Sequence, residues 1–352
     1  MTSVNTKIGW GVIGAGGIAD RRTIPGLLKA NNAELKVFFD ADAKRMPDLA
    51  KKYPMAQASA NIDELLGNDA VSAVYIATPV HLHLGQITKA AEAGKHILVE
   101  KPVGLNAAEA EKALNICTKK GVKLGVGLMM RFGTLNQKMK EAVTAGTLGT
   151  IVSGHAQFSC WYPDMAGAWR QNPKLSGGGA LIDLGVHSID LIEYISGLKT
   201  IAVTAVIGTK TFKYASDDSA AVILELSNGA AAVSESNFNV PDAACFTPFE
   251  LYGTGGSLRA YGTMAQDDGG EARIYAADPN AAYNAKQDQS KLEAHSLTGT
   301  MGNLYTREIE SFSNAVLSGK DPEISALDGL HLAKVIDAAY KSSKTGKKIK
   351  IT

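Results

Sequence analysis

Asp183 and His187 stand four residues apart in a stretch dominated by apolar side chains. On an α-helix this spacing brings both side chains to one face. An imidazole can take up a proton near neutral pH, and a carboxylate beside it can orient the ring or hold a substrate hydroxyl. An ordinary polar stripe is the simpler alternative, but polar groups on a mostly buried helix need a reason. We therefore expect an acid–base pair here, with Asp190 extending the same face one turn later.

A lysine at the end of an expected strand is a second chemical candidate. The apolar run His96–Val99 leads into Glu100-Lys101-Pro102, and ligands bind at the carboxyl ends of the strands of a parallel sheet. An ammonium group at that edge could polarise a substrate hydroxyl or carbonyl. An isolated lysine is more often simply solvated. The position at a strand end, restricted by the following proline, is what makes Lys101 a catalytic candidate.

A glycine-rich turn predicts a dinucleotide site. Its residues are Gly14, Ala15, Gly16, Gly17, Ile18 and Ala19, which match the GxGxxA fingerprint between an expected strand and an expected helix. The glycines allow a tight turn and close approach of a pyrophosphate, whose charge is met by N–H groups at the helix start. The next strand ends in Asp40, a carboxylate that can hold the adenosine ribose diol and would repel a 2′-phosphate. NAD is therefore favoured, with NADP as the alternative because Lys44 and Arg45 lie nearby.

Two histidines follow the strand that ends at Thr78-Pro79. His81 and His83 form an HxH pair, but two such side chains diverge at a helix start, so a surface or supporting role is favoured over a metal site. The three cysteines, without a CxxC pair, are Cys117, Cys160 and Cys245. We predict no metal, no disulfide framework and a reducing, cytoplasmic location.

The elements that must position these groups fall into two domains. Over residues 1–127, short apolar runs alternate with helical segments, which predicts a doubly wound parallel sheet of the Rossmann type. The expected strands are Ile8–Ile13, Leu35–Phe39, Val71–Ile76, His96–Val99 and Val122–Val126. The expected helices are Ala43–Tyr53, His83–Ala93 and Ala107–Lys119, and Gly94 and Gly121 are expected to end two of them.

Residues 128–352 predict an α+β domain with a large, mostly antiparallel open sheet. Its expected strands are Ile151–Phe158, Ile201–Thr209, Ala220–Leu226, Ala230–Asn237 and Phe249–Gly253. One apolar helix is expected at Gly178–Ile195, and the C-terminal helices over 304–343 could pack back on the first domain. The segment Gln266–Leu292, rich in Asp, Gly, Ala and Asn, is expected to be an irregular loop or lid.

Charge and composition exclude several classes of protein. Lys and Arg number 36 and Asp and Glu 35 in 352 residues, so a formal charge of +1 leaves no broad basic field for nucleic acid or acidic membranes. Apolar residues make up 45% of the chain, which is typical of a globular protein and argues against wholesale disorder. The polar first residues and the lack of an uncharged apolar stretch of about 20 residues predict no signal peptide and no membrane span.

Taken in chain order, the motifs resemble those of the Gfo/Idh/MocA family, named after glucose–fructose oxidoreductase, inositol dehydrogenase and a rhizopine-catabolism protein. The matching stretches are Gly14–Ala19, Ala77–His83, Ala93–Pro102, Met130–Phe132, Trp169–Arg170 and Gly177–Leu191. They span nearly the whole chain, and six ordered motifs are far more specific than one glycine loop. Val80 departs from the family pattern, which has Asn there, and this puts one cofactor-side contact in question.

The resemblance implies roles for single residues. Lys101 would bind the reacting oxygen, His187 would be the general base for the hydroxyl proton, and Asp183 would contact the substrate or His187. The residues implied on the cofactor side are Gly14, Gly16, Gly17, Ile18, Asp40, Thr78, Pro79, His83, Glu100, Lys101, Arg131, Trp169 and Arg170. Trp161 and Tyr162 could stack on a sugar face or belong to the core. The second domain would bind the substrate and pair through its open sheet in a homodimer or homotetramer, which would also cover an exposed sheet.

The predicted function is hydride transfer between a ring hydroxyl carbon of a sugar, glycoside or cyclic polyol and NAD. Oxidation of a glucose-like ring is the most specific expectation. Two alternatives from other classes stay open: a redox-neutral, NAD-dependent glycoside hydrolase, and a non-catalytic dinucleotide or sugar sensor on the same fold. A metal enzyme that uses His187 and Asp183 is a third alternative.

Overall fold

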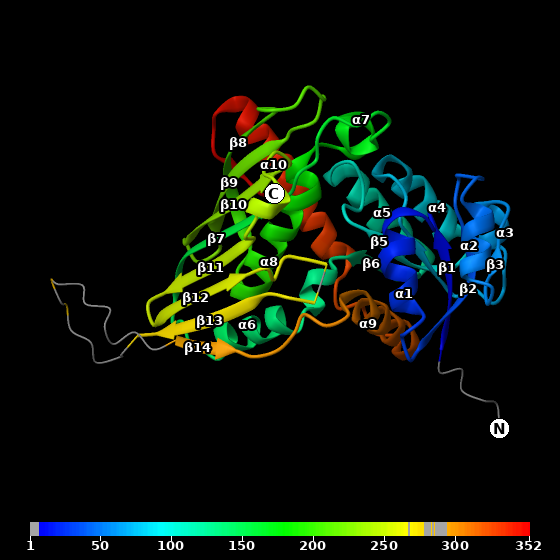
Figure 1. The fold of residues 1–352 in the computed structure, drawn as a ribbon, viewed down its shortest axis with the longest axis horizontal. Coiled ribbons are helices and arrows are strands. Elements are labelled where there is room, and N and C mark those ends of the chain that lie inside the picture. The colour runs from blue at the N-terminus through cyan, green and yellow to red at the C-terminus, as the bar shows by residue number, and fades with distance from the viewer. Residues whose placement is uncertain (1–6, 267, 278–282, 284, 286–293) are drawn as a thin grey trace. The chain divides into compact units, whose positions relative to one another are not determined.

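A computed structural model describes residues 7–266, 268–277, 283, 285 and 294–352 of the chain (Figure 1). The chain divides into two compact units. The first unit comprises Met1–Met129, Lys174–Gly177 and Asn303–Ala333. The second comprises Met130–Pro173, Gly178–Gly302 and Lys334–Thr352.

The first unit contains a six-stranded sheet in which every strand pairing is parallel. The strands are β1 (Ile8–Ile13), β2 (Ala33–Phe39), β3 (Gln57–Ala58), β4 (Ala73–Ile76), β5 (His96–Glu100) and β6 (Leu124–Gly127). Their order is β3-β2-β1-β4-β5-β6, so the direction of winding reverses between β1 and β4. Ligands of doubly wound sheets bind outside the carboxyl ends of the strands at this switch point. The doubly wound parallel sheet expected from the sequence is confirmed.

Helices connect these strands, except for η3, which follows β6 and has residues in both units. They are η1 (Ala19–Thr23), α1 (Ile24–Leu27), α2 (Met46–Lys52), α3 (Ile62–Leu66), η2 (Val80–Leu82), α4 (His83–Glu92), α5 (Ala107–Lys120) and η3 (Met129–Phe132). The side chain of Asn106 accepts a hydrogen bond from the Glu109 N–H and so caps α5. Gly121 ends the same helix in the left-handed conformation, with φ of 68°.

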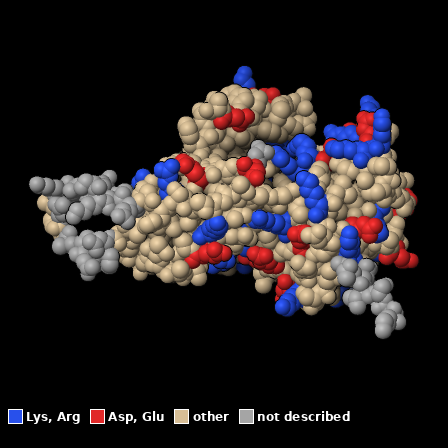
Figure 2. Space-filling model, turned by 60° about the horizontal axis from the view of Figure 1, so that its bottom comes forward, with Lys and Arg blue, Asp and Glu red and all other residues tan. Residues whose placement is uncertain are grey.

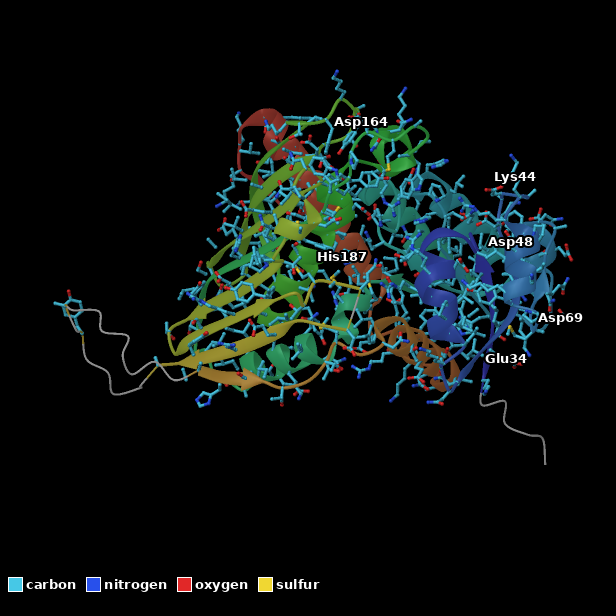
Figure 3. All side chains as sticks on the ribbon, in the orientation of Figure 1. Glu34, Lys44, Asp48, Asp69, Asp164 and His187 are labelled. Carbon is cyan, nitrogen blue, oxygen red and sulfur yellow. The ribbon has the colours of Figure 1, made fainter. Side chains whose placement is uncertain are left out.

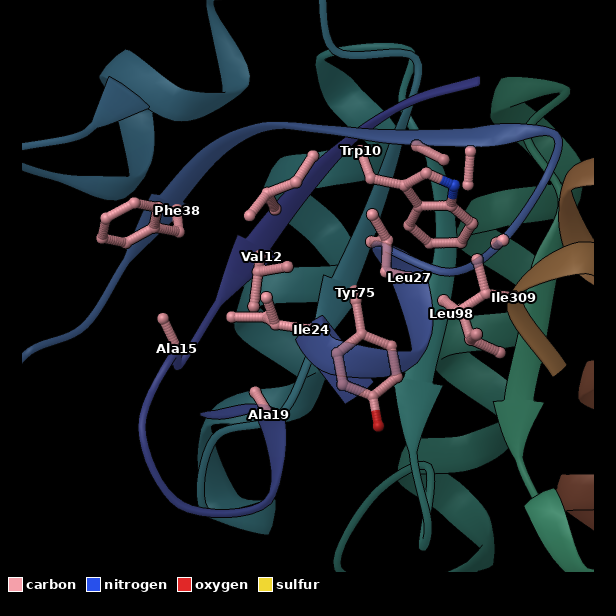
Figure 4. Close-up of a cluster of buried hydrophobic side chains, with 14 of the residues drawn as sticks. Trp10, Val12, Ala15, Ala19, Ile24, Leu27, Phe38, Tyr75, Leu98 and Ile309 are labelled. Carbon is pink, nitrogen blue, oxygen red and sulfur yellow. The ribbon is translucent and has the colours of Figure 1, made fainter. Parts of the chain in front are cut away.

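The core of the first unit includes a helix from the far end of the sequence. Helix α9 (Leu304–Ser318) contributes the fully buried Ile309, which lies beside Trp10, Tyr75 and Leu98 in the cluster of Figure 4. The Trp10 indole donates a hydrogen bond of 3.1 Å to Ser313 on the same helix. Because α9 packs against this core, its polar side chains can reach the carboxyl end of the parallel sheet.

The second unit is built on a nine-stranded mixed sheet of order β14-β13-β12-β11-β7-β10-β9-β8-β15. The strands are β7 (Ile151–Ser159), β8 (Thr200–Gly208), β9 (Ser219–Leu226), β10 (Ala231–Asn237), β11 (Pro248–Gly253), β12 (Gly256–Tyr261), β13 (Glu271–Ala276), β14 (Ala294–Leu297) and β15 (Ile349–Lys350). In this sheet β7 and β10 pair in parallel and all the other pairings are antiparallel. The large, mostly antiparallel sheet expected from the sequence is therefore confirmed.

Helices of the second unit position its chemistry. They are α6 (Thr134–Thr144), η4 (Trp169–Gln171), α7 (Pro173–Ser176), η5 (Leu181–Gly185), α8 (Val186–Ser196), η6 (Asp242–Ala244) and α10 (Ala326–Thr345), of which α7 and α10 have residues in both units. Helices α6 and α8 pack on one another and on one face of the sheet (Figure 1). At Gly185 the helix approaches β10 so closely that a Cβ atom would lie 2.7 Å from the Ser236 hydroxyl oxygen. The glycine thus lets the helix that carries His187 pack directly on the sheet.

Two sequence predictions of secondary structure are wrong. The interval Gln266–Leu292 contains β13 at Glu271–Ala276, where Ala272 and Ile274 are buried and the alternate residues are exposed or half-buried. The strand is short and its alternating residues are only weakly apolar, so the sequence pattern did not indicate it. Residues 267, 278–282, 284 and 286–292 of the interval lie outside the described residues. The helix expected at Gly178–Ile195 begins instead with the π-helical turn η5 before α8.

The surface agrees with the balanced charge of the sequence. On the face drawn in Figure 2, basic and acidic side chains are interspersed among uncharged residues. Within the described part of the chain, we find no helix that is both long and apolar enough to cross a membrane.

Candidate active site

The glycine loop of the first unit has the conformation that a dinucleotide fingerprint requires. Gly14 has φ of 84°, and its N–H donates 2.8 Å to the carbonyl of Phe39 at the end of β2. A Cβ atom on Gly14 would lie 2.9 Å from the Ala77 carbonyl oxygen, so a larger residue would clash with the loop after β4. Gly17 also has positive φ, 54°, and open space where a side chain would be. The loop leads from β1 directly into a helix, so its residues fit a dinucleotide pyrophosphate.

Asp40 lies against this loop, as a ribose-binding carboxylate should. The Gly16 N–H donates to Asp40 Oδ2 at 2.7 Å, and the Asp42 N–H donates to Asp40 Oδ1 at 2.9 Å. Arg45 lies at the same place, since a Cβ atom on Gly16 would be 2.6 Å from Arg45 Nη1. Arg45 also pairs with Asp42 at 3.1 Å. Gly16 therefore lies next to two groups of opposite charge: the Asp40 carboxylate, which suits a ribose diol, and the Arg45 guanidinium, which suits a 2′-phosphate. Lys44, the other basic candidate, is labelled in Figure 3.

His83 joins the two loops that follow β4 and β5. Its Nδ1 lies 2.9 Å from the Pro102 carbonyl oxygen and its Nε2 lies 2.9 Å from the Thr78 carbonyl oxygen. The ring is buried, and burial lowers the pKa of His83 to about 4. Thr78 also donates from its hydroxyl to Gln86 at 2.6 Å. The His83 ring therefore connects the Thr78-Pro79 and Lys101-Pro102 segments through contacts with their backbone carbonyls.

A cluster of acids and tyrosines surrounds Glu100, the residue before Lys101. The Tyr75 hydroxyl donates to the Glu100 carboxylate, and the Thr23 hydroxyl donates to the Tyr75 oxygen at 3.0 Å. Glu308, on α9, is 2% exposed, and among the described residues neither of its carboxylate oxygens has a hydrogen-bond partner. Burial, reinforced by the negative charge of Glu100, raises the pKa of Glu308 well above its usual value. The pKa of Tyr305, one turn earlier, is also raised by burial.

The acid–base pair of the second unit lies on a distorted helix. Asp183 is in the π-helical turn η5, and His187 is in the first turn of α8. His187 is only 4% exposed, and its ring centroid lies 6.0 Å from that of Phe158 on β7. Figure 3 labels His187 on this helix. π-helical turns are rare and are frequently found at functional sites, which agrees with the candidate role of Asp183.

Arg170 pairs with Asp183 and so joins the site. Its Nε lies 3.3 Å from Asp183 Oδ2, and its guanidinium lies 4.3 Å from the centroid of the Trp169 ring. The negative charge of Asp183 raises the pKa of Arg170. Burial raises the pKa of Tyr162, and the positive charge of Arg170 and a hydrogen bond with it partly offset that rise. Asp183, Arg170 and Tyr162 are therefore brought together within one unit. A guanidinium, a carboxylate and a phenol at one place can hold vicinal hydroxyl groups.

Asp190 and Arg131 form a buried ion pair with each other. Arg131 Nε lies 3.0 Å from both Asp190 carboxylate oxygens, and its Nη2 lies 2.5 Å from Oδ1. Both side chains are buried. The carboxylate of Asp190, which the sequence placed on the same helix face as Asp183 and His187, is thus bound to Arg131. Trp161, by contrast, is exposed and packs on Phe212, with ring centroids 5.2 Å apart.

Matches to family models cover both units. A model described as "Oxidoreductase family, NAD-binding Rossmann fold" matches residues 8–128, and one described as "GFO/IDH/MocA C-terminal domain" matches residues 136–259. The chain belongs to the GFO/IDH/MocA family. It is an oxidoreductase with a nucleotide-binding Rossmann domain, and the family resemblance inferred from its motifs is confirmed.

Relatives of this GFO/IDH/MocA protein match it over nearly its full length. D-xylose 1-dehydrogenase (NADP(+)) 2 of Haloferax volcanii is 29% identical over 345 residues, which cover 97% of this chain and 99% of that protein. D-glucoside 3-dehydrogenase of Escherichia coli is 26% identical, with 100% and 99% covered. The crystal structure of aldose-aldose oxidoreductase from Caulobacter crescentus, complexed with glycerol, superposes with a TM-score of 0.86 at 25% identity and covers 98% of this chain and 99% of its own.

Sequence reasoning about this family member missed several site groups. Tyr75, Tyr305 and Glu308 were not singled out, nor was the pairing of Arg170 with Asp183. Glu308 had a detectable signal, because it lies four residues from both Leu304 and Phe312 and so falls on the apolar face of its helix. The partners of Asp183 and Asp190 had none, since only the fold brings them together.

Proposed function

We propose that this protein transfers a hydride between a ring hydroxyl carbon of a sugar, glycoside or cyclic polyol and a nicotinamide dinucleotide. Bound dinucleotide would supply the hydride acceptor or donor. The observation that carries the proposal is the Asp183, His187 and Arg170 group on and beside η5 and α8. Relatives matched over their full length are named D-xylose 1-dehydrogenase and D-glucoside 3-dehydrogenase, which supports a sugar ring as substrate.

The proposed residue roles follow from side-chain chemistry. In oxidation, His187 takes the proton of the reacting hydroxyl while the Lys101 ammonium stabilises the negative charge that develops on the oxygen. Asp183, held by Arg170, orients the substrate hydroxyls or the His187 ring. Tyr162 and Trp161 present ring faces of the kind that stack on sugars. The reverse reaction uses the same groups, with His187 returning the proton.

We propose NAD as the preferred dinucleotide, with NADP as the alternative. Asp40 adjoins the glycine loop through the Gly16 N–H, and its charge favours a ribose diol over a 2′-phosphate. Arg45 offers the opposite charge beside it. The remaining residues proposed on the cofactor side are those of the loops after β4, β5 and β6, and the segment Trp169–Arg170. The residues are Thr78, Pro79, His83, Glu100, Arg131, Trp169 and Arg170.

We also propose that residues 1–127 bind the dinucleotide and that residues 128–352 bind the substrate and mediate assembly. One face of the nine-stranded sheet carries Val206 and Ile223, which are 67% and 52% exposed. Exposed apolar strands favour association, so we propose a homodimer or homotetramer through this face.

Three free thiols, at Cys117, Cys160 and Cys245, favour a cytoplasmic location.

Nicotinamide absorbance tests the proposed reaction. The purified protein is given NAD or NADP separately, with a panel of inositols, free sugars and aryl glucosides, and His187→Ala serves as the control. Reduction that depends on one class of ring and is lost in His187→Ala is the expected result. Cleavage of an aryl glucoside without net reduction would identify a redox-neutral hydrolase instead. Dinucleotide binding without turnover of any ring would identify a sensor.

A further inference from the structure

One buried carboxylate holds the segment that precedes the catalytic helix. Asp217, 7% exposed, accepts hydrogen bonds from the Gly179 N–H at 2.8 Å and from the Leu181 N–H at 2.9 Å. The Tyr340 hydroxyl, from α10, donates to the same carboxylate at 2.7 Å. The Asp217 carbonyl accepts a further bond from the Ala180 N–H at 2.8 Å. Three consecutive backbone N–H groups at the helix start are therefore bound to one residue, and all of these groups lie in the second unit.

Gly178 and Gly179 are needed because the close contacts here leave no room for a side chain. A Cβ atom on Gly179 would lie 1.9 Å from the Asp217 carbonyl oxygen, and one on Gly178 would lie 2.0 Å from the Tyr340 hydroxyl oxygen. Any side chain at either position would push the segment away from Asp217 and Tyr340. Gly178 and Gly179 thus have a role that neither cofactor binding nor helix capping by itself explains.

The contacts lead directly to a proposed catalytic residue. The Gly179 N–H binds Asp217, while the Gly179 carbonyl accepts the Asp183 N–H at 3.1 Å. The carboxylate also lies at a helix start, where negative charge is favourable. Burial together with the charge of Asp217 raises the pKa of Tyr340 well above its usual value, so its hydroxyl stays a donor. A single residue, Gly179, therefore links the buried carboxylate of Asp217 to the backbone of Asp183.

We propose that Asp217 and Tyr340 are positioning residues for the reaction: together they fix the start of η5 and so the aim of Asp183 and His187. The inference rests on the proposed function for its kinetic readout. Neither residue is proposed to touch substrate or dinucleotide. A shift of about 1 Å in a reacting group can cost about a hundredfold in rate, so loss of the clamp affects turnover more than stability.

Tyr340→Phe tests the proposal with the smallest possible change, the loss of one hydroxyl. Tyr252→Phe is its matched control, because Tyr252 also donates its hydroxyl to a carboxylate, Glu250, at 2.8 Å in the same unit. For Tyr340→Phe we expect kcat to fall about tenfold, the effect of roughly one hydrogen bond, with dinucleotide Kd unchanged. The control should keep wild-type kcat, and thermal midpoints of both variants should stay close to wild type. Wild-type kcat in Tyr340→Phe would overturn the positioning role.

A double-mutant cycle with Asp217→Asn separates positioning from general structural support. If the two side chains act as one clamp, Tyr340→Phe should lower kcat far less in the Asp217→Asn background than in wild type. Multiplicative losses would overturn the proposal. Should Asp217→Asn fail to fold, Tyr340→Phe alone still decides.

Amide hydrogen exchange at Leu181 and Asp183 gives a readout that needs no substrate. Faster exchange at these amides in Tyr340→Phe, with protection unchanged in Tyr252→Phe, is expected. If no sugar is turned over but this exchange result holds, the proposed function has failed while the clamp stands. Unchanged exchange at both amides would mean that the clamp does not exist in solution.

Discussion

At the scale of single residues, the groups proposed for the reaction differ in charge and in proposed role. Asp183 and Arg170 pair at 3.3 Å, whereas the buried His187 ring lies beside the ring of Phe158, with the two centroids 6.0 Å apart. Lys101 stands at the carboxyl end of β5, the edge at which parallel sheets bind ligands. The proposed chemistry therefore depends on few side chains, and a substitution can test each of them.

Lys101→Ala should lower kcat about a hundredfold or more, because one preorganised electrostatic stabiliser typically contributes that much. Steady-state kinetics with the ring substrate identified in the panel measures the effect. Lys119→Ala, an exposed lysine on α5, is the control and should retain wild-type kcat. Near-normal turnover in Lys101→Ala would remove Lys101 from the mechanism.

Asp40→Ser should shift the dinucleotide preference toward NADP, since the serine keeps a hydroxyl for the ribose and removes the charge that repels a 2′-phosphate. Arg45→Ala should act in the opposite direction and weaken NADP binding alone. The ratio of kcat/KM for NAD and NADP measures both. An unchanged ratio in Asp40→Ser would show that Asp40 does not contact the adenosine ribose.

At the scale of secondary-structure elements, helix α9 brings an acid to the end of a strand. Glu308 is buried near Glu100, and Tyr75 and Tyr305 face the same cluster, with Arg21 and Arg22 of η1 contributing positive charge toward Tyr305. Two carboxyl groups close together in a buried site cannot both ionise cheaply. The raised pKa of Glu308 therefore favours its protonated form, whereas Glu100 accepts a hydrogen bond from Tyr75.

Glu308→Gln should stabilise the protein, and increasingly so as pH rises. Because the pKa of Glu308 is raised in the folded state, folding binds a proton that the unfolded chain releases above its ordinary value of 4.5. The wild-type free energy of unfolding then falls by up to about 1.4 kcal/mol per pH unit between that value and the raised pKa, whereas glutamine carries no such penalty.

Denaturant unfolding of both proteins between about pH 5 and about pH 8 measures this difference. Glu111→Gln, at an exposed site on α5, should leave the pH dependence unchanged. If Glu308→Gln is instead destabilising, and more so at higher pH, Glu308 is ionised and paired in the folded protein.

Elements also set how far the sequence alone could predict this molecule. Apolar runs located five of the six parallel strands, but β3 has only two residues, Gln57 and Ala58, both exposed, and offers no such pattern. Spacing on one helix identified Asp183 and His187. It could not reveal the π-helical turn, nor that Arg131, 59 positions away, would pair with Asp190. Local patterns predict elements and the residues on them, whereas pairings between distant segments depend on packing.

At the scale of the whole molecule, the nine-stranded sheet leaves one face with exposed apolar residues. Across neighbouring strands, Thr204 of β8, Ile223 of β9 and Val233 of β10 lie in one register row. The next row contains Val206. Close by, His155 Nε2 lies 3.1 Å from Glu235 Oε2. Apolar patches rimmed by polar residues are typical of interfaces between subunits.

Ile223→Glu should convert the proposed homo-oligomer into monomers, because it places a charge in the centre of the apolar row. Size-exclusion chromatography with light scattering gives the mass of each species. Leu327→Glu, which changes another exposed apolar residue at the start of α10, should leave the assembly intact. A wild-type protein that is already monomeric, or an oligomer that Ile223→Glu does not disturb, would rule out this face as the interface.

The central claim is that a hydride passes between a ring carbon and the nicotinamide, and isotope transfer tests it most directly. The protein is incubated with oxidised dinucleotide and the active ring substrate carrying deuterium on its ring carbons, and the dinucleotide is analysed by mass spectrometry. We predict reduced dinucleotide that carries one deuterium, formed by wild type and not by His187→Ala. Reduced dinucleotide without deuterium, or turnover of the ring with no deuterium ever reaching the nicotinamide, would contradict the account.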